Sequence, residues 1–143
     1  MDKKQKTLHI MVGLPRSGKS TKAKKLAKDK GYVIVNPDSI RLALHGKAHD
    51  EDLEPYVWGI TKTMVKSLFL AGHNDVILDA TNVAKSWRDK WKSDSWKRKF
   101  HVVNTSEEIC IYRALGEENK ELAEVIKYMA SIYEPVTKDE RKE

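Results

Sequence analysis

The chain has 143 residues, of which 40% are hydrophobic and 34% charged, and its formal net charge is +6. This length suits one compact domain, and this composition excludes an intrinsically disordered chain. No apolar run is long enough to span a bilayer, the first residues lack a signal-peptide pattern, and the lone Cys110 excludes an intramolecular disulfide. We therefore expect one domain over residues 1–143 in a reducing, cytoplasmic setting, with no membrane and an anionic partner such as a nucleotide or nucleic acid.

Strand and helix patterns alternate along the chain. In chain order they predict a strand at 7–12, a helix at 20–30, a strand at 32–35, a helix at 37–44, a loop at 45–54, a helix at 57–72, a strand at 75–79, a helix at 83–93, a strand at 100–103, and helices at 107–115 and 122–132. Gly31, Gly46 and Pro135 mark element ends, because these residues interrupt regular structure. The charged residues 137–143 are expected to fray.

This alternation predicts an α/β fold in three layers, with a mainly parallel sheet of about four to five strands and helices on both faces. Ligands in such folds bind beyond the carboxyl ends of the strands. The candidate binding residues are therefore those that follow the predicted strands, at 13–21, 36–41, 79–82 and 104–105.

The first of these strand ends carries a phosphate-binding motif. It matches G-x-x-x-x-G-K-[ST] in full, is followed by Thr21, and consists of Gly13, Leu14, Pro15, Arg16, Ser17, Gly18, Lys19 and Ser20. The glycines let backbone N–H groups point at anionic oxygens, and the helix N-terminus adds its positive end. Lys19 is expected to reach the β- and γ-phosphates, and the Ser20 hydroxyl is expected to ligate Mg²⁺. Residues 13–21 thus predict ATP and Mg²⁺ binding on a P-loop NTPase fold.

Asp79 ends an apolar strand, as the acidic residue of a Walker B strand does. Such a carboxylate holds the Mg²⁺ shell together with the P-loop hydroxyl. A helix cap or turn residue is the alternative interpretation. Thr81 and Asn82 follow at once, and their side chains could bond a phosphate, the acceptor or the local backbone.

Asp38 and Arg41 form a second candidate pair, three residues apart on one face of a predicted helix. The carboxylate could accept the proton of an attacking hydroxyl while the arginine fixes an anionic group of the same acceptor. The equal alternative is a surface ion pair in which Asp38 also caps the helix.

Taken together, the motifs resemble those of bacteriophage-type polynucleotide 5′-kinases and related small P-loop kinases. The resemblance covers about residues 7–133 and is carried, in order, by residues 13–20, 36–41, 79–82 and 112–113. It implies that Asp38 is the general base for a 5′-hydroxyl and that Arg41 binds the acceptor's neighbouring phosphate. It also implies that Asp79 organises the active site and that Arg113, on a short C-terminal lid followed by a helix, contacts the donor phosphates.

The lid departs from that pattern, because no second arginine follows Arg113 in residues 114–120. Lys120 could supply a charge, although lysine does not reproduce a guanidinium fork. Arg16, inside the phosphate loop, could partly compensate.

We therefore expect an ATP-dependent kinase that releases ADP and phosphorylates a hydroxyl, preferably the 5′-hydroxyl of RNA or DNA. One alternative is a kinase of a small molecule such as a sugar, a nucleoside or a similar alcohol. The other is a non-catalytic ATP-binding module, which the arginine-poor lid suggests.

Two further patterns favour packing over function. Basic residues alternate with tryptophans in residues 85–99, which could track a nucleic-acid strand. Inward packing of Trp87 and Trp91, four residues apart, is the preferred interpretation. His9 and His101 lie in predicted strands and are expected to be packed or hydrogen-bonded rather than catalytic.

Overall fold

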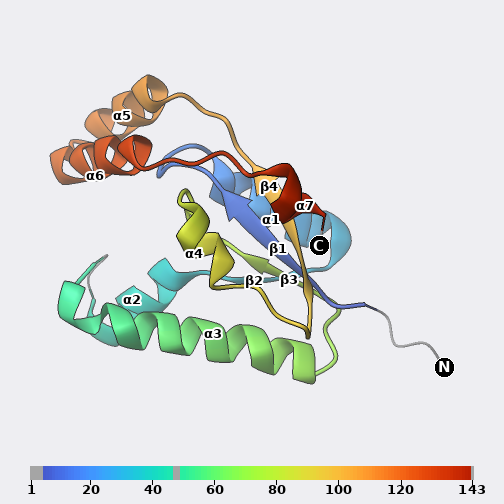
Figure 1. Cartoon of the computed structure of the whole chain (residues 1–143). Coiled ribbons are helices and arrows are strands. Elements are labelled where there is room, and N and C mark those ends of the chain that lie inside the picture. The colour runs from blue at the N-terminus through green and yellow to red at the C-terminus, as the bar shows by residue number, and fades with distance from the viewer. Residues whose placement is uncertain (1–4, 47–48, 143) are drawn as a thin grey trace.

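The computed structural model describes residues 5–46 and 49–142 (Figure 1). Over these residues the strands form one sheet in the order β2-β3-β1-β4, and every neighbouring pair is parallel. The strand bounds are Thr7–Val12 for β1, Val33–Val35 for β2, Asp75–Leu78 for β3 and Lys97–Val102 for β4. The predicted parallel α/β architecture is confirmed, with four strands in the described part of the chain.

Helices cover both faces of the sheet, and α2, α5 and α6 gather at its carboxyl edge (Figure 1). The helix bounds are Lys19–Lys30 for α1, Pro37–His45 for α2, Glu54–Leu70 for α3, Lys85–Asp89 for α4, Glu107–Gly116 for α5, Lys120–Ser131 for α6 and Lys138–Arg141 for α7, with a 3₁₀ turn, η1, at Glu51–Leu53. Within the described residues, no helix combines the length and the apolar character that crossing a membrane requires.

Strand β1 lies in the middle of the core, with all six of its residues buried. Successive side chains of a strand point to opposite faces. Leu8 and Ile10 pack with Phe69 of α3 on one face, whereas Met11 packs with Ala23 of α1 on the other. Strands buried on both faces are typical of parallel sheets, and burying each large aliphatic side chain stabilises the fold by roughly 1.5–3 kcal/mol.

The start of α2 is set by Asn36, not by Asp38 as one interpretation of the sequence held. The Asn36 side-chain oxygen accepts hydrogen bonds from the backbone N–H groups of Asp38, at 2.8 Å, and Ser39, at 3.4 Å. Pro37 occupies the first helical position, where its missing N–H costs nothing. The Asp38 carboxylate is therefore left out of the cap.

The segment between β3 and β4 differs from the prediction. Helix α4 covers only Lys85–Asp89, because the chain then turns to bury two indoles. The turn is closed by the Trp96 indole N–H, which donates to the Trp91 carbonyl at 2.9 Å. Strand β4 begins at Lys97, earlier than predicted, because its charged first residues still pair in parallel with Thr7 and the residues after it.

The expectation that residues 137–143 fray is wrong for the described residues of this segment. Residues Lys138–Arg141 form α7, and Thr137 and Glu140 make a reciprocal capping box. Glu140 is buried and accepts two hydrogen bonds from Arg88. Arg88, which lies 52 residues from Glu140 in the sequence, thus holds this segment in place. No local sequence pattern predicts such a contact.

Within the basic and aromatic stretch from residue 85 to 99, two tryptophans and both arginines pack into the core, while several lysines stay exposed. Trp91, Trp96, Arg88 and Arg98 are all buried, so their side chains are withdrawn from any strand of nucleic acid. Packing of Trp91 is thus confirmed, while Trp87 is half-buried against the α5–α6 cluster.

A partly buried chain of hydrogen bonds joins three strands on the α1 side of the sheet. His9 Nδ1 lies 2.9 Å from His101 Nε2, and His9 Nε2 lies 2.9 Å from an Asp75 carboxylate oxygen. The Tyr32 ring stacks on His9 with centroids 4.7 Å apart. The expectation that both histidines are packed or hydrogen-bonded is confirmed. Burial lowers the pKa of both, that of His101 to about 4.

This pKa shift predicts an acid-sensitive fold. In the unfolded chain, a histidine has a pKa near 6.5. In the folded protein, the pKa of His101 is about 4, so between these two pH values the unfolded state binds a proton that the folded state does not bind. The free energy of unfolding should therefore fall between pH 7 and pH 5, by about 1–2 kcal/mol more in the wild type than in His101→Gln, which cannot titrate. Urea unfolding at the two pH values measures this difference. Equal losses in the two proteins would show that His101 does not carry the effect.

Candidate active site

The loop between β1 and α1 is held at both sides by neighbouring strand ends. Gly13 N–H donates to the Thr81 carbonyl at 3.0 Å, and the Thr105 hydroxyl donates to the Ser17 carbonyl at 2.6 Å. Arg16 and Gly18 have φ angles of 65° and 97°, in the left-handed region. The loop therefore curls back on itself in the way that phosphate-binding backbone nests do.

Gly13 is required by this curl. A Cβ at this position would lie 2.7 Å from Ser17 Oγ and 3.2 Å from the Val103 carbonyl oxygen. Ser17 Oγ is buried, and the residues that the structure describes offer it no hydrogen-bond partner. A tight loop with an unpartnered polar atom has the character of a ligand cradle.

Helix α1 begins directly after the loop, and its first turn is open to an anion. Gly18 occupies the cap position in a left-handed conformation, without a side-chain hydrogen bond to the helix N–H groups. Ser20 lies in this turn and is partly exposed, and Thr21 next to it is exposed. Uncapped N–H groups at a helix N-terminus bind phosphate oxygens well.

Asp79 is the buried carboxylate at the centre of the site. Lys19 Nζ lies 3.5 Å from Asp79 Oδ1, and the Asn36 side-chain amide donates to Asp79 Oδ2 at 3.2 Å. Oδ1 finds no hydrogen bond among the described residues. A free carboxylate oxygen and the Ser20 hydroxyl are hard oxygen donors of the type that Mg²⁺ takes. The residues present thus fit a magnesium nucleotide, whose phosphates and water would complete the shell.

The second strand end carries an ion-pair network around Arg41. The Arg41 guanidinium donates to both Glu54 oxygens, at 2.9 and 2.7 Å, and to Asp38 Oδ1 at 2.6 Å. It also lies over the Trp58 ring, 5.7 Å from the centroid. The hydrogen bonds from Arg41 lower the pKa of Glu54. The predicted pairing of Asp38 with Arg41 is present, and Glu54 is a partner that the sequence analysis missed.

The Asp38 carboxylate is far more accessible than its partners. Its side chain is 66% exposed, against 14% for Arg41 and 17% for Glu54. Arg41 donates to one of the two Asp38 oxygens, Oδ1. Asp38 is therefore oriented by Arg41 and open to an incoming group.

The residues after β3 shape the site through their backbone. Asn82 is buried with a φ of 46°, and its amide donates to the Met11 carbonyl at 2.9 Å and the Ala80 carbonyl at 3.3 Å. The sequence analysis left open whether the Asn82 side chain bonds a phosphate, the acceptor or the local backbone. In the structure it bonds the local backbone, at Ala80. The carbonyl of its neighbour Thr81 accepts the Gly13 N–H, while the Thr81 side chain is partly exposed.

The predicted lid, at residues 113–120, spans the end of α5 and the start of α6. These two helices, which we term the lid helices, lie against the phosphate loop. Arg113 Nη1 donates to the Arg16 carbonyl at 2.9 Å, and Arg16 Nε donates to Glu117 at 2.7 Å. Leu14 of the loop packs in the same buried cluster as Cys110 and Ile126 of these helices. The structure thus brings Arg113 to the phosphate loop, and it adds Glu117, for which the sequence carried no signal.

All four predicted segments meet at the carboxyl edge of the sheet (Figure 1). This fold and this loop define a P-loop nucleotide-binding protein with a kinase-like fold. The chain belongs to the AAA domain family AAA_33, whose family model matches residues 8–135. No curated protein matches the chain.

Solved structures with this fold include proteins of nucleic-acid and of sugar chemistry. Two are a chain of the Pnkp1/Rnl/Hen1 RNA repair complex and a chain of a Pnkp1/Rnl/Hen1 complex, both with a TM-score of 0.69. One is 19% identical over 93% of this chain and 48% of its own length, and the other is 28% identical over 79% and 40%. The chain therefore spans less than half of these relatives.

Two other neighbours are covered along most of their own length. A gluconokinase from Sinorhizobium meliloti 1021 is 18% identical over 98% of this chain and 81% of its own, with a TM-score of 0.64. A sugar kinase from Janibacter sp. HTCC2649 is 19% identical over 94% and 81%, with a TM-score of 0.68. At these identities the likeness concerns the fold alone.

Proposed function

We propose that this protein transfers the γ-phosphoryl group of Mg·ATP to a hydroxyl group, and that the acceptor is the 5′-hydroxyl of a polynucleotide. The observation that carries the proposal is the position of Asp79. Its carboxylate contacts Lys19 of the phosphate loop and Asn36, which caps the helix that bears Asp38. One buried side chain thus connects the donor side of the site to the acceptor side.

The residues divide the work of phosphoryl transfer among them. Lys19, the loop N–H groups and Arg113 hold the donor phosphates and offset their charge, which is the main source of catalysis in this reaction class. Bound Mg·ATP supplies the activated phosphoryl group and further charge neutralisation. Asp38 orients the acceptor hydroxyl and takes its proton, and Arg41 holds the Asp38 carboxylate in place. Ser20 and Asp79 would provide oxygen ligands for the metal.

Four observations support a polynucleotide acceptor. The motifs follow one another in the order of polynucleotide 5′-kinases. A chain of the Pnkp1/Rnl/Hen1 RNA repair complex shares the fold, with a TM-score of 0.69. The net charge of +6 favours a polyanion. Arg41 retains guanidinium N–H groups beyond the three that bond Glu54 and Asp38. These N–H groups would bind the acceptor's phosphate.

A small alcohol is the second candidate, and the acceptor side itself favours it. Two carboxylates, Glu54 and Asp38, already neutralise Arg41. An uncharged hydroxyl compound would approach this cluster without repulsion, whereas a phosphate would meet two negative charges. The sugar kinase neighbours share the fold.

Transfer of labelled phosphate from ATP to 5′-hydroxyl oligonucleotides and to a panel of sugars and nucleosides tests the proposal. Labelling of oligonucleotides should fall steeply as salt rises, because each phosphate contact releases counterions, while labelling of a neutral alcohol should change little. Salt-insensitive labelling of small alcohols alone would replace the first candidate by the second. ATP binding without labelling of any acceptor would contradict both and indicate a non-catalytic module.

A further inference from the structure

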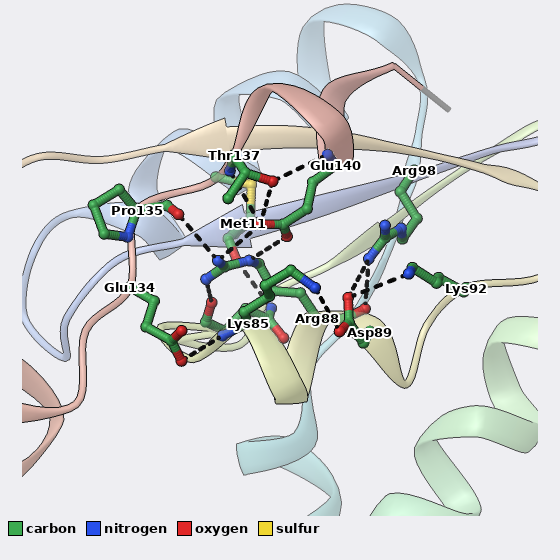
Figure 2. Close-up of polar contacts among 11 residues, drawn as sticks. Met11, Lys85, Arg88, Asp89, Lys92, Arg98, Glu134, Pro135, Thr137 and Glu140 are labelled. Atoms are coloured by element: carbon green, nitrogen blue, oxygen red, sulfur yellow. Dashed lines mark hydrogen bonds and ion pairs between the residues drawn. The ribbon is translucent and has the colours of Figure 1, made fainter.

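Arg88 is the largest fully buried side chain in the described residues, and it lies outside the proposed catalytic groups. Its guanidinium faces the Glu140 carboxylate in a two-pronged pair, with Nε 2.7 Å from Oε2 and Nη2 3.1 Å from Oε1 (Figure 2). Both side chains are excluded from solvent. A buried ion pair of this kind gives little net stability compared with apolar residues of the same size. Stability alone therefore does not explain the pair, and the other contacts of Arg88 and Glu140 indicate its role.

The same guanidinium also donates to two backbone carbonyls. Arg88 Nη1 lies 2.9 Å from the carbonyl oxygen of Asn82, and Nη2 lies 3.4 Å from that of Pro135 (Figure 2). One side chain thus joins the turn after β3, the chain that leaves α6, and α7. A planar fork with five N–H donors can serve these acceptors together, whereas a lysine ammonium cannot match the geometry.

Glu140 is equally well fixed. Its Oε1 accepts from the Thr137 N–H at 3.0 Å and from the Thr137 hydroxyl at 3.2 Å. Burial alone would raise the pKa of Glu140, but the hydrogen bonds from Arg88 and Thr137 hold it at about 2. The carboxylate is therefore charged throughout the physiological range, and the pair does not act as a pH switch.

The bonds around this pair continue into the candidate site. Asn82, whose carbonyl Arg88 holds, bonds the Met11 carbonyl of β1 through its side chain. Its neighbour Thr81 accepts the N–H of Gly13 at 3.0 Å. Only two residues separate Asn82 from Asp79. The pair thus acts on the segment that positions the central carboxylate and the first residue of the phosphate loop.

The bonds also reach the lid. Residues 134–141, which we term the return segment, follow α6 and include α7. Glu134, Pro135, Thr137 and Glu140 of this segment lie around Arg88 of α4 (Figure 2). Glu134 N–H donates to the Val83 carbonyl at 2.8 Å, and Lys85 N–H donates to the Glu134 carboxylate at 3.2 Å. The lid helices are therefore attached to the turn after β3 through the return segment.

We propose that Arg88 and Glu140 are positioning residues for phosphoryl transfer. The pair holds the return segment against residues 79–82, so that the carboxylate of Asp79, the phosphate loop and the lid keep one relative placement. The activity part of this inference rests on the proposed function, whereas the structural coupling does not. The competing explanation is that the pair only docks α7 onto the domain.

Hydrogen exchange and kinetics of Glu140→Gln and Arg88→Lys, compared with wild type, test the inference. The matched control is Asp29→Asn, which removes the charge of an exposed ion pair with Lys25 on α1. We expect the Gly13 and Glu134 amides to exchange at least about tenfold faster in both variants, because their acceptors lie in the segments that the pair holds. The kcat for transfer should fall by about 10²-fold, and the KM for ATP should change much less. The control should match wild type.

The possible outcomes separate the two explanations. Faster exchange confined to α7, with Gly13 and Glu134 amides and kcat as in wild type, would overturn the inference. If wild type transfers no phosphate, the proposed function fails, and the exchange rates at Gly13 and Glu134 still decide the coupling. Thr137→Val loosens Glu140 without removing a charge, so it should give an intermediate acceleration and provides the test if the charge variants do not fold.

Discussion

Lys19→Ala is expected to lower the rate of phosphoryl transfer by about 10³-fold or more. Two effects act together. The variant lacks the ammonium group that would offset the phosphate charge, and it leaves the buried Asp79 carboxylate without the cation 3.5 Å from its Oδ1. The unpaired carboxylate would then repel the nucleotide as well, so the KM for ATP should rise.

Steady-state kinetics with the best acceptor from the transfer panel measure this loss. Lys25→Ala is the matched control, because Lys25 lies on the same helix and forms only an exposed ion pair with Asp29. The control should retain wild-type kinetics. A fully active Lys19→Ala protein would refute the assigned role of Lys19.

Asp38→Asn should lower kcat by about 10²–10⁴-fold, the usual contribution of a general base. Asparagine keeps the size of the side chain and an oxygen that can accept the Arg41 hydrogen bond, so α2 should keep its structure. The affinity for ATP should change little, since Asp38 contacts Arg41 and the capping residue Asn36 rather than the phosphate loop.

Turnover and nucleotide titration of the same Asp38→Asn preparation check these two expectations. Asp29→Asn, the same substitution at an exposed position of α1, serves as the control for the chemistry of the change. Near-normal turnover would exclude Asp38 as the base. A parallel loss of ATP affinity would indicate that α2 contributes to the donor side instead.

The sequence predicted the fold well wherever a local pattern carries the information. The apolar strand 7–12, the glycine-rich loop after it and the helix 20–30 follow from hydrophobic spacing and backbone freedom, and the structure has them in this order. The alternation of strands and helices was enough to predict a parallel sheet, because parallel strands require long crossover connections. That topology in turn brings residues 36–41 and 79–82 to the edge where the loop lies.

The prediction was wrong where long-range contacts decide the outcome. The charged residues at the start of β4 and after residue 137 have the composition of exposed or frayed chain, yet Arg98 and Glu140 are buried. The same limit applies to the site. Glu54 lies 13 residues from Arg41, and no spacing rule indicates that its carboxylate takes two of the guanidinium bonds.

The sequence by itself determined that the chain has a phosphate loop, a carboxylate after β3 and an Asp38–Arg41 pair. Each of these features depends only on residues close together in the sequence. Only the tertiary structure decided how these groups are held. Arg88 and Glu140 are 52 residues apart, and each would be read as exposed. Burying the charge of Arg88 or Glu140 is unfavourable unless the other is placed beside it and the Asn82 and Pro135 carbonyls accept the remaining Arg88 hydrogen bonds. Only the complete tertiary structure brings these groups together.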